Sequence, residues 1–203
     1  DTGPLTKKRM ETIDQEFLDA TIDFIERKDD EDTPWFCWFN PSHMHYHTHV
    51  PDDYKGKSGL NVYADGMIQH DDQIGILLEK LDQMDIADNT IVIYTTDNGV
   101  HFNMWPNGGI TPFRGEKNTN WEGAYRVPFA MRWPDKIEAG KVENGITSHT
   151  DWLPTLMAVV GEDDISKKLK EGYKVGDMTY KVHFDGFNLL PNKEGVLDGS
   201  VGM

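Results

Sequence analysis

The stretch IVIYTTDNG, residues 91–99, joins a strand-like apolar run to an abrupt polar end. Residues 91–94 are apolar or aromatic, which is typical of a strand buried on both faces of a parallel sheet. Asp97, Asn98 and Gly99 then stop the pattern. A plain turn explains this tripeptide, because Asp and Asn side chains bond to nearby backbone. A cation site also explains it, with two oxygen ligands and a glycine that lets the backbone fold back. On its own, the tripeptide favours the turn.

Two amphipathic helices and two further strands are predicted around this stretch. Apolar residues recur at three- and four-residue spacing over residues 8–27 and 62–84. The run WFCWFN, residues 35–40, predicts a strand buried on both faces, and VPFAMRWP, residues 127–134, predicts a third strand that ends at Pro134. Helices that alternate with continuous apolar strands predict an α/β fold, with a mostly parallel sheet flanked by helices.

The C-terminal part of the chain gives weaker signals. Thr150 or Asp151 can cap a helix that has Trp152 and Leu156 on its apolar side. Residues 161–203 are charged and loop-rich, and the pattern assigns no element to them.

Composition excludes several classes of protein and site. The 203 residues carry a formal net charge of -15, which argues against nucleic-acid binding because a duplex binder needs a basic face. No apolar run approaches the roughly 20 residues that cross a bilayer. The single cysteine, Cys37, excludes an internal disulfide and a cysteine-rich zinc site. The opening DTGPLTKKRM shows neither a signal peptide nor an initiator methionine, so we expect a fragment of a longer protein.

A histidine-rich segment, NPSHMHYHTHVP, follows the first predicted strand, at residues 40–51. It has histidines at alternate positions: His43, His45, His47 and His49. A metal-binding tract and an incidental polar loop both explain this composition. The third interpretation is one histidine that gives or takes a proton in a cleft, oriented by its neighbours. Composition alone favours the first two.

A third polar cluster, TPFRGEKNTNWEGAYRVP, occupies residues 111–128 and contains Lys117. A solvated lysine is the commonest kind, and the alternative is an ammonium group that binds an anionic substrate oxygen. All three clusters follow or flank predicted strands, and open α/β sheets bind ligands outside the carboxyl ends of their strands.

Taken together, the order of these motifs resembles that of the type I sulfatases, and in particular bacterial arylsulfatases of the alkaline-phosphatase-like superfamily. The motifs are FNPSHMHYHTHVP, YADGMI with DDQIGILLEKL, IADNTIVIYTTDNG, TPFRGEKNTNWEGAYRVPFAMRWP and HTDWLPTLMAVVG. The resemblance implies an alkaline-phosphatase/sulfatase-like fold that is incomplete here. Residues 1–191 would be the C-terminal portion of the large α/β domain. Residues 192–203 would be an irregular tail, either the start of the smaller C-terminal subdomain or a non-native end.

The resemblance also implies roles for individual residues. Asp97 and Asn98 match the family's ligands for a divalent cation, calcium or alternatively magnesium. Lys117 matches the lysine that binds the sulfate. His45 matches the histidine that contacts the sulfate ester and protonates the leaving oxygen, with His43 and His49 as alternative registers and His49 as a further substrate contact. Asn98 stands where the zinc phosphohydrolases of the superfamily have histidine, and an amide oxygen suits calcium or magnesium better than zinc.

The implied function is calcium-dependent hydrolysis of a small-molecule or carbohydrate sulfate monoester, with this chain carrying part of the active site. The family's nucleophile, a formylglycine, is expected in a segment before residue 1. Cys37 lacks the proline and arginine of that motif, so we interpret it as a buried strand thiol. Two alternatives stay open: a phosphate or phosphonate monoester hydrolase of the same superfamily, and a non-catalytic remnant that binds a cation and an anion. The family resemblance is compatible with a periplasmic or secreted protein.

Overall fold

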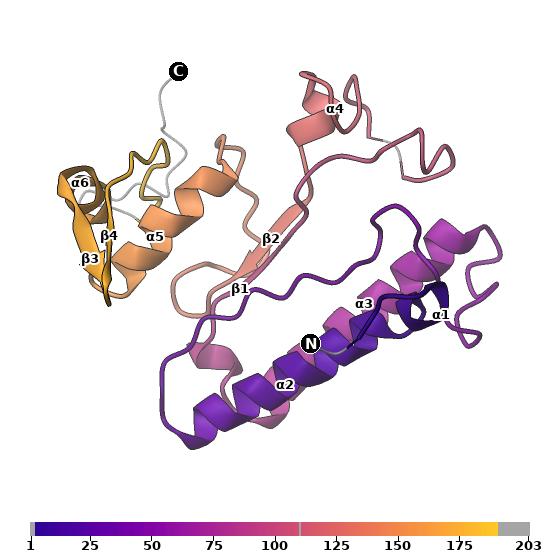
Figure 1. Cartoon of the computed structure of the whole chain (residues 1–203), viewed down its shortest axis with the longest axis horizontal. Coiled ribbons are helices and arrows are strands. Elements are labelled where there is room, and N and C mark those ends of the chain that lie inside the picture. The colour runs from indigo at the N-terminus through magenta and orange to yellow at the C-terminus, as the bar shows by residue number, and fades with distance from the viewer. Residues whose placement is uncertain (1–2, 110, 191–203) are drawn as a thin grey trace. The chain divides into compact units, whose positions relative to one another are not determined.

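The computed structural model describes residues 3–109 and 111–190 (Figure 1). They fall into two compact units, Asp1–Ala139 and Gly140–Met203, each with its own helices and its own two-stranded sheet. The predicted boundary at residue 191 and the predicted tail, 192–203, lie outside the described residues. Within these residues, no helix is both long enough and apolar enough to cross a membrane.

The first predicted helix forms as two pieces, α1 (Lys7–Met10) and α2 (Ile13–Asp30), with a turn between them. The hydroxyl of Thr6 accepts a hydrogen bond from the Arg9 backbone and caps α1. The three- and four-residue spacing gives α2 one buried side, as predicted. Its buried residues are Ile13, Asp14, Leu18, Thr21 and Ile25.

The second predicted helix is confirmed as α3 (Val62–Gln83), which begins at an asparagine cap: Asn61 Oδ1 accepts from the Ala64 backbone at 3.0 Å. Helices α2 and α3 lie side by side (Figure 1). Their contacts show that they run in the same direction. Gln73 Nε2 donates to Gln15 Oε1 near the start of α2, and Lys80 pairs with Glu26 near its end.

After each of these helices the chain returns in the opposite direction. Residues 35–40 run back along α2, and Trp35 packs edge-to-face on Phe24 with ring centroids 6.5 Å apart. After α3 and the short helix η1 (Ala87–Asn89), strand β1 (Val92–Thr95) runs back, and the Tyr94 hydroxyl lies 3.1 Å from His70 Nε2. The two returning segments therefore share one direction, as in a parallel α/β unit.

A parallel sheet is nevertheless not confirmed. Strand β1 pairs with β2 (Phe129–Arg132) in antiparallel fashion, with Thr95 opposite Phe129. The described backbone of residues 35–40 makes no hydrogen bond to another described residue, so this predicted strand does not form here. The predicted burial on both faces is also wrong, because Phe36 is 66% exposed and Trp38 is 77% exposed.

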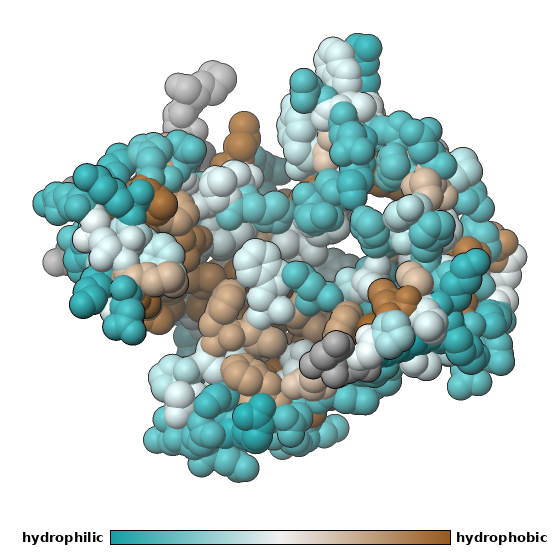
Figure 2. Space-filling view, in the orientation of Figure 1, coloured by the Kyte–Doolittle hydropathy of each residue, from teal (hydrophilic) through white to brown (hydrophobic). Residues whose placement is uncertain are grey.

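The second unit contains the third predicted helix. A 3-10 turn, η2 (His149–Asp151), leads into α5 (Trp152–Val159), and the cap is Ser148, whose side chain and backbone bond reciprocally with Thr150 and Asp151. The region without a predicted element forms α6 (Ile165–Glu171) and a hairpin of β3 (Tyr173–Val175) and β4 (Met178–Tyr180). Figure 2 shows hydrophobic areas on the surface of both units.

Candidate active site

The tripeptide Asp97-Asn98-Gly99 directly follows β1 and Thr96, and it meets another backbone segment. The backbone N–H of Gly99 donates to the Ala124 carbonyl at 2.7 Å. A Cβ on Gly99 would lie 1.8 Å from the carbonyl oxygen of Gly123. Gly99 does not have a positive φ, so the glycine is required by close approach rather than by the folding back that the sequence suggested.

The loop that carries Lys117 is bonded to the same place. Gly123, in the short helix α4 (Glu122–Tyr125), donates to the Arg114 carbonyl at 2.7 Å. The backbone N–H of Lys117 donates to the Val100 carbonyl at 3.0 Å. Main-chain hydrogen bonds therefore hold Lys117 beside the segment that follows Asp97 and Asn98, so two of the three predicted clusters come together.

The side chains of Asp97 and Lys117 have no ion-pair partner within the described residues. Asp97 is exposed and Lys117 is half-buried, and neither forms an ion pair with another residue in the described part of the chain. Asn98 Nδ2 donates to the Gly99 carbonyl at 3.1 Å, which leaves the amide oxygen of Asn98 free to act as a ligand. This lysine can therefore bind an anion without first breaking an ion pair.

The two arginines of the same loop are engaged with aromatic rings. The guanidinium of Arg114 lies 3.8 Å from the ring centroid of Trp121. That of Arg126 lies 4.3 Å from the centroid of Phe113, and it also pairs with Glu122 at 3.5 Å. These cation–π contacts stabilise the loop and leave the lysine as its uncommitted cation.

The donor set fits a hard cation in part. A carboxylate and an amide oxygen are ligands that Ca²⁺ and Mg²⁺ accept, and Ca²⁺ takes about six to eight of them. Asp97 and Asn98 supply two. Among the residues described, no group of three or more His, Cys, Asp or Glu side chains could hold a metal ion. Asp97 and Asn98 are therefore two potential ligands, and the described residues form no closed cation site.

The histidine-rich loop is attached to α2 through a buried carboxylate, Asp14. Asp14 accepts hydrogen bonds from the backbone N–H of Ser42 at 2.7 Å, from that of His43 at 2.9 Å, and from Nδ1 of the His43 ring. His43 Nε2 lies 3.3 Å from the carbonyl oxygen of His49. The His43 side chain is 1% exposed, so neither ring nitrogen is available to a substrate.

The surroundings of Asp14 change its acidity. Burial by itself would raise the pKa of this carboxyl group, and the hydrogen bonds and charge of His43, together with those of Ser42, more than offset that effect. The pKa of Asp14 falls from 3.8 to about 2. Asp14 is therefore a carboxylate at every pH at which the protein would work.

His45 and His49, the remaining candidates for a proton donor, are held differently. His45 is exposed, and its backbone is fixed by bonds to Ser42 and to the hydroxyl of Thr48 at 2.9 and 2.8 Å. His49 is half-buried and stands between two buried residues, Thr48 and Val50. The roles of His45 and His49 both stay predictions, and His49 is the more buried of the two.

Trp105 connects the histidine-rich loop to the segment that follows Gly99. Its indole Nε1 donates to the Met44 carbonyl at 3.2 Å, and its ring packs edge-to-face on Tyr63 at 5.3 Å between centroids. Sequence reasoning missed Trp105 and Asp14. The available signals were an aromatic residue in a Gly- and Asn-rich loop, and a carboxylate on the apolar side of an amphipathic helix.

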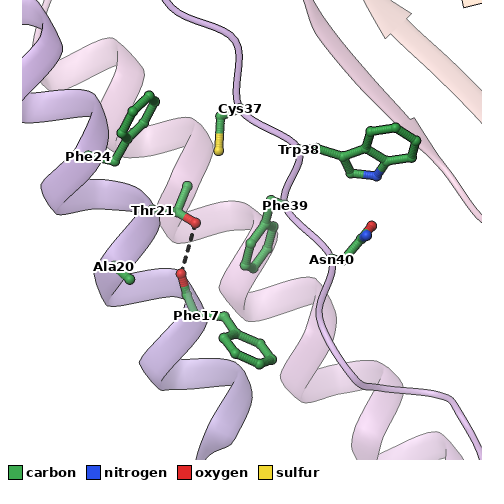
Figure 3. A pocket seen from close by; sticks show the side chains of 8 residues that line it. All are labelled: Phe17, Ala20, Thr21, Phe24, Cys37, Trp38, Phe39 and Asn40. Carbon is green, nitrogen blue, oxygen red and sulfur yellow. Dashed lines mark hydrogen bonds between the residues drawn. The ribbon is translucent and has the colours of Figure 1, made fainter. Parts of the chain in front are cut away.

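Cys37 lies in an open groove of about 330 Å³ between α2 and residues 37–40 (Figure 3). It is half-buried and outside any strand of the described chain, which corrects the expectation of a buried strand thiol. Burial raises the pKa of its thiol more than a hydrogen bond with Thr21 lowers it. A protonated thiol is a poor nucleophile, so Cys37 is not activated as a thiolate. The other residues that line the groove are Phe17, Ala20, Phe24, Trp38, Phe39 and Asn40.

Comparison with known proteins places this arrangement in a family. The model of the sulfatase family matches residues 1–162. Human arylsulfatase H is 32% identical over 200 residues, 95% of this chain and 32% of its own length. Human N-acetylgalactosamine-6-sulfatase is 31% identical over 181 residues, 88% of this chain and 32% of its own length.

A solved structure agrees with these matches. The PsFucS1 sulfatase from Pseudoalteromonas sp. superimposes with a TM-score of 0.80 at 31% identity, over 91% of this chain and 35% of that one. The chain thus spans about a third of the length of the relatives it matches, which have the alkaline-phosphatase-like fold. The chain belongs to the sulfatase family.

Proposed function

We propose that the protein hydrolyses a sulfate monoester of a small molecule or carbohydrate, with calcium as the resident cation. One observation carries the proposal: Lys117, half-buried and without an ion pair in the described chain, is bonded through its backbone to the segment after Asp97 and Asn98. An anion site thus adjoins part of a cation site, as a sulfate group requires. Named sulfatases among the relatives support this chemistry.

Each group has a distinct role in the proposed reaction. Lys117 binds the sulfate oxygens as a point charge and stabilises the charge that they carry in the transition state. Asp97 and Asn98 hold the cation through their side-chain oxygens. A divalent cation bound there polarises the sulfate and lowers the pKa of an attacking hydroxyl group.

The leaving oxygen requires a proton, which a histidine of the loop after residue 40 donates. We propose His49 for this step, because it is the more buried of the two candidates and its carbonyl oxygen faces Nε2 of the buried His43, and His45 is the alternative. Sulfatases generally use a metal ion and a formylglycine. Cys37 lacks the proline and arginine of the formylglycine motif, so it does not fit that nucleophile.

The test uses the protein expressed from its complete gene and 4-nitrophenyl sulfate as substrate. We expect a metal-dependent activity that a chelator removes and calcium restores. Lys117→Ala should lower kcat/KM by about 10²–10³-fold, as expected for a preorganised charge contact of the transition state. Lys136→Ala, an exposed lysine of the same unit, is the matched control and should leave kcat/KM unchanged.

Two results would overturn the proposal. Faster turnover of 4-nitrophenyl phosphate or a phosphonate monoester than of the sulfate would show a phosphohydrolase. Calcium binding without turnover of either ester would show a non-catalytic binding protein.

A further inference from the structure

The buried pair of Asp14 and His43 has no place in the proposed reaction, yet it is one of the most completely bonded polar groups of the first unit. Asp14 is 0% exposed, and its two oxygens accept the three hydrogen bonds described above. The backbone N–H groups of Ser42 and His43 donate to the two oxygens of this carboxyl group, and its lowered pKa keeps it ionised, so it only accepts. The donor to Asp14 from the imidazole ring must therefore be a protonated Nδ1.

The other ring nitrogen faces a carbonyl group. A carbonyl oxygen has lone pairs and no proton, so a hydrogen bond between the His49 carbonyl oxygen and Nε2 of His43 is one that Nε2 donates. With Nδ1 and Nε2 both donating, the ring carries two protons and a positive charge. Among the described residues, His70 from α3 interacts with both Asp14 and His43; burial lowers the pKa of His70, and the nearby Asp14 and Asp71 raise it.

We infer that Asp14 and His43 form a buried carboxylate–imidazolium pair, and that this pair positions His49 for catalysis. The chain of contacts is continuous: α2 holds Asp14, Asp14 holds the His43 ring and backbone, and the ring holds the carbonyl of His49. Asp14 and His43 are positioning residues, because no substrate reaches them. The charge state of the pair does not depend on the proposed function, whereas its effect on catalysis rests on that function.

The charge state is measured by ¹⁵N–¹H NMR of histidine-labelled protein, expressed from the complete gene. An imidazolium shows two protonated nitrogens of similar ¹⁵N shift, whereas a neutral ring shows one protonated and one bare nitrogen. We expect an imidazolium signal at neutral pH that disappears in His43→Asn and remains in His47→Asn, an exposed histidine of the same loop. A bare nitrogen on His43 at neutral pH would overturn the inference.

The positioning role is measured with two substrates of different leaving group. An alkyl sulfate needs its leaving oxygen protonated, whereas 4-nitrophenolate leaves without help. Asp14→Asn should therefore lower kcat/KM for the alkyl sulfate at least about tenfold more than for 4-nitrophenyl sulfate, because the proton donor is displaced. Asp23→Asn, an exposed residue of the same helix, should change neither.

The outcomes separate the two proposals. Equal losses on both substrates would reduce Asp14 to a structural residue and overturn the positioning role. If the wild-type protein hydrolyses neither sulfate, the proposed function fails, while the NMR spectrum still decides the charge state of the pair.

Discussion

Residues 35–40 and residues 42–49 are neighbours in the chain and follow the same helix, yet they are held in opposite ways. The second segment is bonded to α2 by Asp14, to itself through Thr48, and to Trp105 through Met44. The first contacts α2 through side chains alone, and its backbone makes no hydrogen bond within the described chain. Local side-chain acceptors fix a loop, whereas an extended segment depends on a neighbouring strand for its order.

The largest effect on stability is expected where residues 42–49 lose their hydrogen bonds to Asp14 of α2. Asp14→Ala removes the acceptor of three hydrogen bonds and leaves the His43 ring buried without a counter-charge. We expect the free energy of unfolding to fall by about 3–5 kcal/mol, as when one partner of a buried ion pair is removed. Chemical denaturation measures it. Asp23→Ala, on the exposed side of α2, is the control. An equal loss of unfolding free energy in both variants would contradict the claim that Asp14 holds residues 42–49.

The close approach of the Gly99 backbone to the Gly123 carbonyl is the place where a substitution should have the next largest effect on stability. Gly99→Ala places a Cβ 1.8 Å from the Gly123 carbonyl oxygen, so one segment must move. We expect a loss of about 3 kcal/mol, at the upper end of the range for overpacking. Gly109→Ala is the control, because its Cβ would meet nothing within 4 Å. Thermal denaturation compares the two, and similar melting temperatures would refute the close approach.

A smaller effect follows from the acidity of Asp14. Its pKa in the folded state, about 2, lies below the ordinary 3.8. The stabilisation that this difference gives is therefore complete above about pH 4 and is lost as the pH falls through about 2. We expect about 2 kcal/mol, since one unit of pKa corresponds to about 1.4 kcal/mol.

The stability difference between wild type and Asp14→Asn, followed by urea denaturation from neutral to acid pH, measures that contribution. It should shrink in the window from about pH 4 to about pH 2. A constant difference across this window would show that the pKa of Asp14 is not lowered.

The smallest change in stability is expected in residues 35–40, whose backbone makes no hydrogen bond within the described chain. Replacing the exposed Phe36 and Trp38 by threonine should alter the free energy of unfolding by less than about 0.5 kcal/mol each. The same changes should raise the solubility of the 203-residue chain, because an unpaired apolar edge promotes association. Light scattering against concentration measures this. A large drop in melting temperature would show instead that these side chains are packed.

The sequence predicts best what short-range physics decides. Helices α2 and α3 and strand β1 follow from spacing within one element, and the structure confirms their positions. Residues 35–40 have the composition of a strand, but pairing depends on a distant segment that composition does not identify. The burial of Asp14 is likewise a long-range effect, because a helix wheel places it on the apolar side without revealing that His43 will meet it.

The candidate site shows the same division. Spacing alone gave three unconnected clusters, and only the resemblance to sulfatases grouped Asp97, Asn98 and Lys117. The structure supplies the physical link, through the backbone bond from Lys117 to Val100 and the crossing at Gly99. The sequence suggests that Gly99 lets the backbone fold back, because a sequence shows what a residue permits, and not which other backbone will lie against it.

The three hydrogen bonds to Asp14 also determine when the histidine-rich loop loses its conformational freedom. Fixing one residue of backbone costs about 1–2 kcal/mol of entropy. Since the loop is already fixed in the folded protein, that entropy is lost once, during folding, and no further share of it opposes the arrival of each substrate.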